Sequence, residues 1–254
     1  MQLKIPGTVP NNYMLRLSKS VSDILTLAKR KATYQTATIT VMLSSGVDSV
    51  AIAHFVAKNK HQLSNILGVP TTSLVVQAFH FNHKLRDQND LMEKSAVAFC
   101  NDFNIPLTLK QSSGILVSEA HARNARMTAL TESIKDSITL TAHHLNDCVE
   151  SYLLNTLRGH EGYLPIPFFT KLQNCVMSHP FIFNTKNDFI EYCKHFNLNK
   201  YIVEDETNKT TKGSRRNLIR NEILPILHRE NIVLNKTISN KMSTRLQELM
   251  NEEG

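Results

Sequence analysis

Apolar and polar positions alternate along the chain in two ways, as short β-branched runs and as longer stretches with helical spacing. The short runs predict four strands, at residues 37–43, 73–81, 107–110 and 137–142. The longer stretches predict helices at residues 15–31, 48–58, 89–103, 118–134 and 145–157. Because strands and helices alternate, the pattern predicts a doubly wound α/β fold, a mostly parallel sheet with helices on both faces.

The rhythm changes after Gly159. Residues 162–169 contain Pro and Phe and predict a loop, and residues 184–196 predict a short helix. The apolar stripe of a last helix, at residues 232–250, consists of Leu234, Ile238, Met242, Leu246 and Leu249. We expect this helix to pack on the main domain; the alternative is a homodimer contact. The predicted division is an N-terminal helical extension (1–36), an α/β domain (37–227) and a small helical C-terminal appendage (228–254).

Composition narrows the class of protein. The chain has 254 residues, of which 41% are hydrophobic, and a net charge of +7, which favours an anionic partner, nucleic acid before a membrane surface. No apolar run is long enough to cross a bilayer and the first residues lack the apolar core of a signal peptide, so a cytoplasmic location is expected. The four cysteines form no C-x-x-C pair, which disfavours a disulfide framework or zinc ribbon and favours reduced thiols.

The segment between the first strand and the next helix is a candidate phosphate loop. Its small residues allow close approach of an anion, and the helix N-terminus offers N–H groups and a partial positive charge. The loop consists of Ser44, Ser45, Gly46, Val47, Asp48 and Ser49, with hydroxyl donors expected at all three serines. Asp48 would repel a phosphate unless a divalent cation, Mg²⁺, bridges the two. The alternative is that a serine or Asp48 only caps the helix.

Further polar segments follow the loop in a defined order. They are HFNHKLR at 80–86, EAHARNAR at 119–126, AHHLNDCVE at 142–150, EDETN at 204–208 and RNLIR at 216–220. The loop resembles the pyrophosphate loop S-G-G-x-D-S of the N-type ATP pyrophosphatases, with Ser45 in place of the first glycine. In order and spacing, the set resembles the motifs of the tRNA(Ile)-lysidine synthetases over residues 38–227.

The resemblance implies a two-step reaction with ATP and Mg²⁺ as cofactors. ATP adenylates C2 of the wobble cytidine in an isoleucine tRNA with a CAU anticodon, and the ε-amine of free L-lysine then attacks C2 and expels AMP. The ATP-binding residues implied are the loop residues 44–49 together with His80, Asn82, His83 and Arg123. The catalytic residues implied are Asp48, His143, Asp147 and Glu150.

The acidic pair and the histidines each leave an alternative open. Asp147 and Glu150 are three residues apart on a predicted helix, where they could hold the lysine ammonium or accept its proton; an ordinary solvated acidic pair is the alternative. Zinc ligation by the histidines is disfavoured, because strand alternation places His80 and His83 on opposite faces. Pocket lining or a structural role is expected for them instead. Arg123 either clamps a phosphate or is simply exposed.

A basic run without acids is the candidate tRNA-binding segment. Its members are Lys209, Lys212, Arg215, Arg216 and Arg220. Such a run suits contacts with backbone phosphates, although a solvated loop is the alternative.

Two departures from the family pattern affect these expectations. If the second loop position requires a positive φ, Ser45 carries a strain of about 1 kcal/mol. Family members commonly have a further C-terminal region that grips tRNA, so here the tRNA is recognised minimally, another protein or a second protomer supplies the grip, or the substrate differs. Two other classes therefore stay open: another adenylating tRNA modifier such as a thiolase, which would want a cysteine pair, and a non-enzymatic nucleotide- or tRNA-binding protein.

Overall fold

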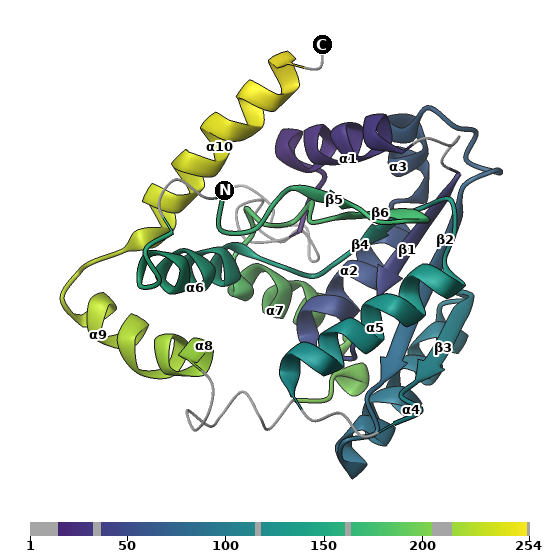
Figure 1. Ribbon diagram of the computed structural model, residues 1–254. Helices are drawn as coiled ribbons and strands as arrows, with labels where there is room; N and C mark the ends of the chain where they lie inside the picture. Colours follow the sequence, from purple (N-terminus) through teal and green to yellow (C-terminus); the bar gives the residue numbers. More distant parts are fainter. Residues whose placement is uncertain (1–14, 33–36, 115–117, 161–163, 205–214, 253–254) are drawn as a thin grey trace, which may run out of the picture.

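A six-stranded sheet forms the centre of the computed structural model, which describes residues 15–32, 37–114, 118–160, 164–204 and 215–252 (Figure 1). The strands are β1 (Thr38–Met42), β2 (Val75–Asn82), β3 (Leu107–Gln111), β4 (Ser137–Leu140), β5 (Phe169–Lys171) and β6 (Cys175–Ser178). Their order in the sheet is β3-β2-β1-β4-β6-β5. All neighbours are parallel except β5, which pairs antiparallel with β6 at one edge.

The central strand β1 shows why these residues form a sheet covered on both faces. Its alternate residues Ile39 and Val41 enter one core cluster, while Met42 packs against another on the opposite face. Val41 is in register with Ala78 of β2 and with Leu140 of β4. A β-branched run buried on both faces is typical of a central parallel strand.

Helices cover both faces of the sheet. Their bounds are α1 (Lys19–Lys31), α2 (Val47–Lys58), α3 (Lys60–Leu67), α4 (Asp87–Asp102), α5 (Glu119–Ser133), α6 (Leu145–Thr156) and α7 (Lys186–His195). The first core cluster joins α1, α2, α3, α4 and α7 to one face. On the other face, Leu130 of α5 packs on Phe79 and Phe81 of β2. The expected doubly wound α/β fold is thereby confirmed.

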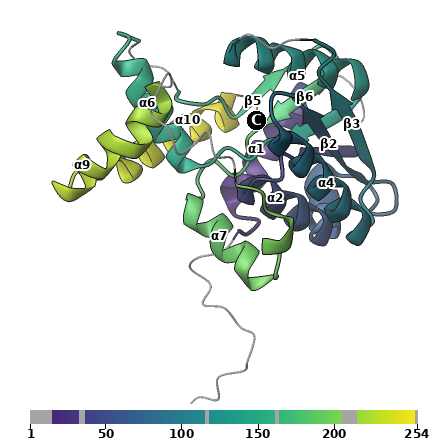
Figure 2. The same ribbon diagram turned by 90° about the horizontal axis from the view of Figure 1, so that it is seen from below.

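The C-terminal part of the chain is helical and lies to one side of the sheet, away from β3 (Figures 1 and 2). It contains α8 (Arg215–Leu218), a π-helical turn η3 (Ile219–Ile223), α9 (Leu224–Arg229) and α10 (Leu234–Glu252). From α10, Ile238, Met242 and Leu246 are buried in a cluster that includes Ile24 of α1 and Leu145 of α6. The apolar stripe of α10 therefore packs on the domain, as expected. The proposed domain boundaries stay a prediction.

Among the elements that did not follow from the pattern are β6, β5 and α3. Strand β6 is fully buried next to β4, but it has only four residues, too few for alternation to show. Strand β5 begins at the end of the expected loop, and α3 directly continues α2 after a break at Asn59. A sheet position for such short segments is decided by the neighbouring strand, which sequence periodicity does not reveal. Within the described ranges, no helix combines the length and the apolar character needed to cross a membrane.

Candidate active site

A cavity of about 1340 Å³ opens at the carboxyl ends of β1 and β4. The chain continues from β1 to one side of the sheet through β2, whereas β4 lies on the other side, so the strand order reverses here. Ligands of open α/β sheets bind at such a switch point. The sequence-predicted residues that line the cavity are Ser44, Gly46, Val47, Asp48, Ser49, His80, Asn82, His83, Arg123, His143, Asp147, Glu150 and Arg220.

The candidate phosphate loop leads directly into the first turn of α2. Gly46 is its N-cap in extended conformation, and no described side chain caps this turn. The Ser49 hydroxyl instead donates to the Gly46 carbonyl and accepts from the Ser44 amide, both at 3.0 Å. The alternative that a serine or Asp48 merely caps the helix is therefore wrong, and the turn presents backbone N–H groups toward the cavity.

Ser45 adopts the left-handed conformation, with φ of 61°. Its side chain is fully buried, and its hydroxyl donates to the carbonyl oxygen of Met92 in α4 at 2.7 Å. The expectation that this hydroxyl faces a phosphate is therefore wrong, because the hydroxyl holds the loop to α4. A strain of about 1 kcal/mol at a non-glycine residue with positive φ is offset by a hydrogen bond of similar magnitude.

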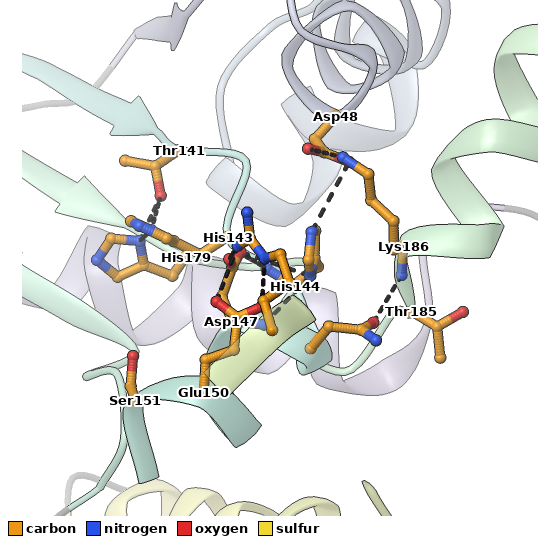
Figure 3. Close-up of polar contacts among 12 residues, drawn as sticks. Asp48, Thr141, His143, His144, Asp147, Glu150, Ser151, His179, Thr185 and Lys186 are labelled. Carbon is orange, nitrogen blue, oxygen red and sulfur yellow. Dashed lines mark hydrogen bonds and ion pairs between the residues drawn. The ribbon is translucent and has the colours of Figure 1, made fainter. Parts of the chain in front are cut away.

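Asp48 is only partly satisfied by its surroundings. Its Oδ2 lies 2.6 Å from Nζ of Lys186, the first residue of α7 (Figure 3). Its Oδ1 is buried and has no hydrogen-bond partner within the described part of the chain, while Nε2 of His144 lies 3.8 Å away. A buried carboxylate oxygen without a donor fits a site completed by a cation. The sequence pattern placed Lys186 near a helix start but gave no signal that α7 reaches the loop.

His144 lies between Asp48 and Asp147 (Figure 3). It caps α6, since its amide donates to Oδ2 of Asp147 at 3.1 Å and its Nδ1 accepts from the Asp147 amide at 3.3 Å. In neutral His144 the proton is therefore on Nε2, which is directed at Asp48. Burial raises the pKa of Asp147, but the positive charges of Arg216 and of His144 and His143 in their protonated forms outweigh it, and the net pKa lies below the ordinary value. Asp147 is thus ionised at neutral pH.

Two arginines hold the buried carboxylate of Glu150. Arg216 Nε lies 3.0 Å from Oε2, and Arg220 binds both oxygens, with Nε 2.6 Å from Oε1 and Nη2 2.8 Å from Oε2. Arg220 Nη2 also lies 3.4 Å from Oδ1 of Asp147. The structure therefore brings together two sets that the sequence treated as separate sites, the amine-binding acids and the tRNA-binding arginines. Arg215 is exposed.

The two remaining basic residues of the predicted tRNA-binding run, Lys209 and Lys212, lie outside the described residues.

Two histidines of the site, His143 and His179, contact each other. His143 Nδ1 is 2.8 Å from the Thr141 hydroxyl and 3.0 Å from Nδ1 of His179, which also contacts Thr141. Burial lowers the pKa of His143 to about 4 and that of His179 to about 3. At neutral pH His143 is uncharged and a weak base, which favours a hydrogen-bonding role. His179 escaped sequence reasoning because it follows β6; recognising that strand would have placed it beside the end of β4.

The end of β2 contributes a further polar wall. His80 and His83 both line the cavity, which corrects the expectation of opposite faces: the strand ends at Asn82, so alternation does not extend to His83. Asn82 Nδ2 donates to Asp90 and Glu93 of α4, each at 2.8 Å. These two acids were not anticipated, since nothing in the sequence indicates which face of α4 meets β2.

Arg123 and Arg126 line the cavity from α5. Nε of Arg126 is buried without a hydrogen-bond partner among the residues that the structure describes. Burial and repulsion by Arg123 lower the pKa of Arg126, although a guanidinium stays charged in proteins. A buried cationic donor without an acceptor favours an anion beside Arg126. Arg123 is exposed, so the alternative of simple exposure stays open for it.

The fold and the site together define a nucleotide-binding α/β protein. Backbone amides of an uncapped helix, the Arg126 Nε donor and the Asp48 Oδ1 acceptor, both without a partner in the described structure, line a cavity at the switch point of a parallel sheet. Residues 17–227 match the family model of the PP-loop domain. The chain belongs to the PP-loop domain family.

Proteins named tRNA(Ile)-lysidine synthase are similar to this chain over most of its length. The one from Haemophilus ducreyi is 32% identical over 224 residues, which cover 84% of this chain and 48% of that protein. The one from Francisella philomiragia is 29% identical over 229 residues, covering 85% of this chain and 53% of that protein. The chain thus spans about half the length of the curated relatives it matches. The resemblance noted in the sequence is confirmed.

Among solved structures, a U34-tRNA thiolase NcsA from Methanococcus maripaludis is similar in fold, with a TM-score of 0.64. The match covers 90% of this chain and 79% of that one at 14% sequence identity. At this identity the likeness concerns the fold alone, and it supports the doubly wound architecture.

Proposed function

We propose that this chain is an ATP-dependent tRNA-modifying ligase that adenylates C2 of the wobble cytidine of an isoleucine tRNA and joins lysine to it. AMP and pyrophosphate are the other products. The observation that carries the proposal is that the loop at 44–49 and the acids of α6 line one cavity. A triphosphate and an amine bound at these two places would both reach a base inserted between them. The similarity to tRNA(Ile)-lysidine synthases supports this choice of substrates.

The phosphate half of the site, formed by the first turn of α2 with Arg123 and Arg126, is suited to bind and orient ATP. The first-turn amides of α2 donate to phosphate oxygens, and Arg123 and Arg126 add positive charge from the opposite wall. Mg²⁺ held by Asp48 through the phosphates would offset their negative charge, and the unsatisfied Oδ1 of Asp48 fits this role. Lys186 provides a second cation beside Asp48. Pyrophosphate leaves when the cytidine C2 oxygen bonds to the α-phosphorus.

The acid half of the site, formed by Asp147 and Glu150, is suited to bind the lysine ε-ammonium. Only the free amine is a nucleophile, so a group in the site must accept a proton before the amine attacks C2 and the C2–O bond to AMP breaks. Asp147 is ionised, faces the cavity and already accepts one hydrogen bond from the backbone of His144, which fixes its orientation. We assign the amine-binding role to Asp147 with Glu150.

The decisive experiment is nucleoside mass spectrometry of an isoleucine tRNA transcript after incubation with the protein, ATP and isotopically labelled lysine. The expected result is a labelled lysidine at the wobble position. Formation of AMP that requires tRNA but does not depend on lysine would favour another adenylating modification. Retained tRNA binding without ATP turnover would favour a binding protein.

The thiolase alternative finds no support in the cysteines. All four are buried and free. Burial raises the pKa of Cys100 and that of Cys148 to about 12, and burial with repulsion by Asp48 raises the pKa of Cys193 to a similar value. Thiols of this kind do not form the reactive thiolate that sulfur transfer requires.

A further inference from the structure

The proposed amine site is already filled by side chains of the chain itself. The Glu150 side chain is 2% exposed, and both of its oxygens accept hydrogen bonds from the guanidinium groups of Arg216 and Arg220. Arg220 also extends to Asp147. A lysine ammonium needs the same carboxylate lone pairs, so the amine and the two guanidinium groups compete for one place.

The same two arginines are suited to a second ligand. Their side chains are 35% and 33% exposed, in contrast to the carboxylate they hold. A guanidinium binds phosphate oxygens with the same two-pronged geometry that it uses for a carboxylate. If Arg220 uses for a backbone phosphate the Nε–Nη2 edge that it now presents to Glu150, it must release Glu150. Arg216 lies in α8 and Arg220 in the π-helical turn η3, and π turns frequently mark functional positions.

Charge balance couples the movement of the two arginines to the binding of lysine. Among the residues that the structure describes, Asp147 and Glu150 face Arg216 and Arg220, so these four side chains together carry no net charge. When both arginines move to phosphates, Asp147 and Glu150 keep two negative charges in a largely buried place, where an unpaired charge is strongly unfavourable. A lysine ammonium restores part of that balance.

We propose that Arg216 and Arg220 form a gate that closes the amine site in the free protein and opens when they bind tRNA backbone phosphates, so that tRNA binding precedes and promotes lysine binding. The gate rests on the proposed amine-binding role of Asp147 and Glu150. Because binding free energies are linked, lysine must strengthen tRNA binding by the same factor.

The test is equilibrium dialysis of labelled lysine against the full chain, without ATP, in the absence and presence of a saturating isoleucine tRNA transcript. We expect tRNA to tighten lysine binding by at least about fivefold, the lower end of typical coupling between sites. Equal lysine affinity in both conditions overturns the gate, while the labelled-lysidine assay described above still decides the proposed function. If tRNA does not change the lysine affinity and no labelled lysidine forms, the proposed ligase function is wrong as well.

Two variants separate a gate from a merely structural ion pair. Glu150→Gln removes the charge that retains the arginines, so tRNA should bind severalfold more tightly while lysine binding is lost; a purely structural Glu150 predicts weaker tRNA binding, and that result would overturn the gate. Arg220→Gln should raise lysine affinity in the absence of tRNA and reduce the coupling. Arg245→Gln removes the same charge from an exposed pair with Glu248 on α10 and is the matched control. If Arg220→Gln does not fold, the gate is still tested by Glu150→Gln and by the effect of tRNA on lysine binding to the wild-type protein.

Discussion

The two halves of the cavity differ in how completely their polar groups are satisfied. In the phosphate half, the first turn of α2 is uncapped, and among the described residues Asp48 Oδ1 and Arg126 Nε lack hydrogen-bond partners. In the acid half, Glu150 accepts from two arginines with short, partly bidentate bonds. One half is therefore prepared for a ligand, whereas the other must exchange internal partners for one.

This difference has an energetic meaning. A buried polar group without a partner destabilises a fold by about 1–3 kcal/mol, and this is recovered when a ligand supplies the partner. Binding at the phosphate half should consequently stabilise the protein. Binding at the acid half replaces one set of ion pairs with another, so its net effect on stability should be small and its specificity should depend on which partner is displaced.

The largest effect is expected when the unsatisfied carboxylate of the phosphate half is neutralised. Asp48→Asn should lower ATP turnover by roughly 10²–10³-fold, the size of effect seen when a single transition-state contact is removed. Pyrophosphate release in the presence of tRNA measures it. The fold should persist, since Asn is isosteric, Asp48 Oδ1 has no internal partner in the described structure, and the ion pair of Oδ2 with Lys186 is partly exposed.

Asp23→Asn is the matched control for that variant, because Asp23 forms an exposed pair with Lys19 on α1, far from the loop in sequence. Its turnover should equal that of the wild type. Normal turnover with Asp48→Asn would remove the proposed metal–phosphate role and leave the contrast between the two halves without functional meaning.

A smaller effect, confined to the second step, is expected in the acid half. Asp147→Asn keeps an acceptor oxygen for the cap on His144 but loses the charge that would bind an ammonium. Loss of a hydrogen bond to a charged group, about 1.5–3 kcal/mol, predicts lysine transfer reduced by about 10- to 100-fold with tRNA adenylation preserved. Single-turnover formation of lysidine and of adenylated tRNA measures the two steps separately. Glu191→Gln, which alters an exposed acid paired with Lys194, is the control.

An equal loss in both steps of Asp147→Asn would mean that the residue supports the whole site through the α6 cap rather than the amine.

The sequence predicted the central sheet because β1, β2 and β4 carry local signals: β-branched runs, flanking helices and polar residues at the strand ends. It did not predict β6, whose four residues form a strand only because β4 offers an open edge. His179 was missed with it. Such positions depend on contacts distant in sequence, which periodicity does not contain.

For the candidate site, the sequence pointed to residues that line one cavity, but it did not indicate their partners. Asp48, Asp147 and Glu150 line one cavity as expected. The contact between Lys186 and Asp48 depends on how α7 packs, and the contact between Arg220 and Glu150 depends on how η3 packs. The first two residues are more than a hundred positions apart in the sequence, and the second two are 70 positions apart. A positive φ at Ser45 was considered only as a condition, and the structure shows it. The direction of the Ser45 hydroxyl depends on α4.

The pair formed by His143 and His179 predicts a pH effect on stability. The pKa of His143 and that of His179 are lowered by burial from 6.5 to about 4 and about 3, so below pH 6.5 the unfolded chain takes up protons that the folded protein does not. Stability should therefore fall as the pH decreases from 6.5 toward these folded-state values, by about 1.4 kcal/mol per pH unit for each histidine. His179→Gln should remove about one histidine's share of this slope between pH 6 and pH 4. Urea unfolding across this range measures it.

His195→Gln, at an exposed histidine on α7, should leave the slope of wild type unchanged. Equal slopes in the two variants would show that His179 is protonated in the fold.

The smallest effect is expected at Ser45, where the loop of the phosphate half is fixed to α4. Ser45→Gly relieves the strain of the positive φ but loses the hydrogen bond to Met92, two changes of about 1 kcal/mol each in opposite directions, so the free energy of unfolding should change little. Ser45→Ala keeps the strain and loses the same bond, so it should be about 1 kcal/mol less stable than Ser45→Gly. Urea unfolding of both variants gives the difference, and ATP titration should give nearly equal affinities, because the hydroxyl points away from the cavity. A severalfold loss of ATP affinity in both variants would mean that the hydroxyl turns toward the phosphates when ATP binds, and that the phosphate half, like the acid half, rearranges around its ligand.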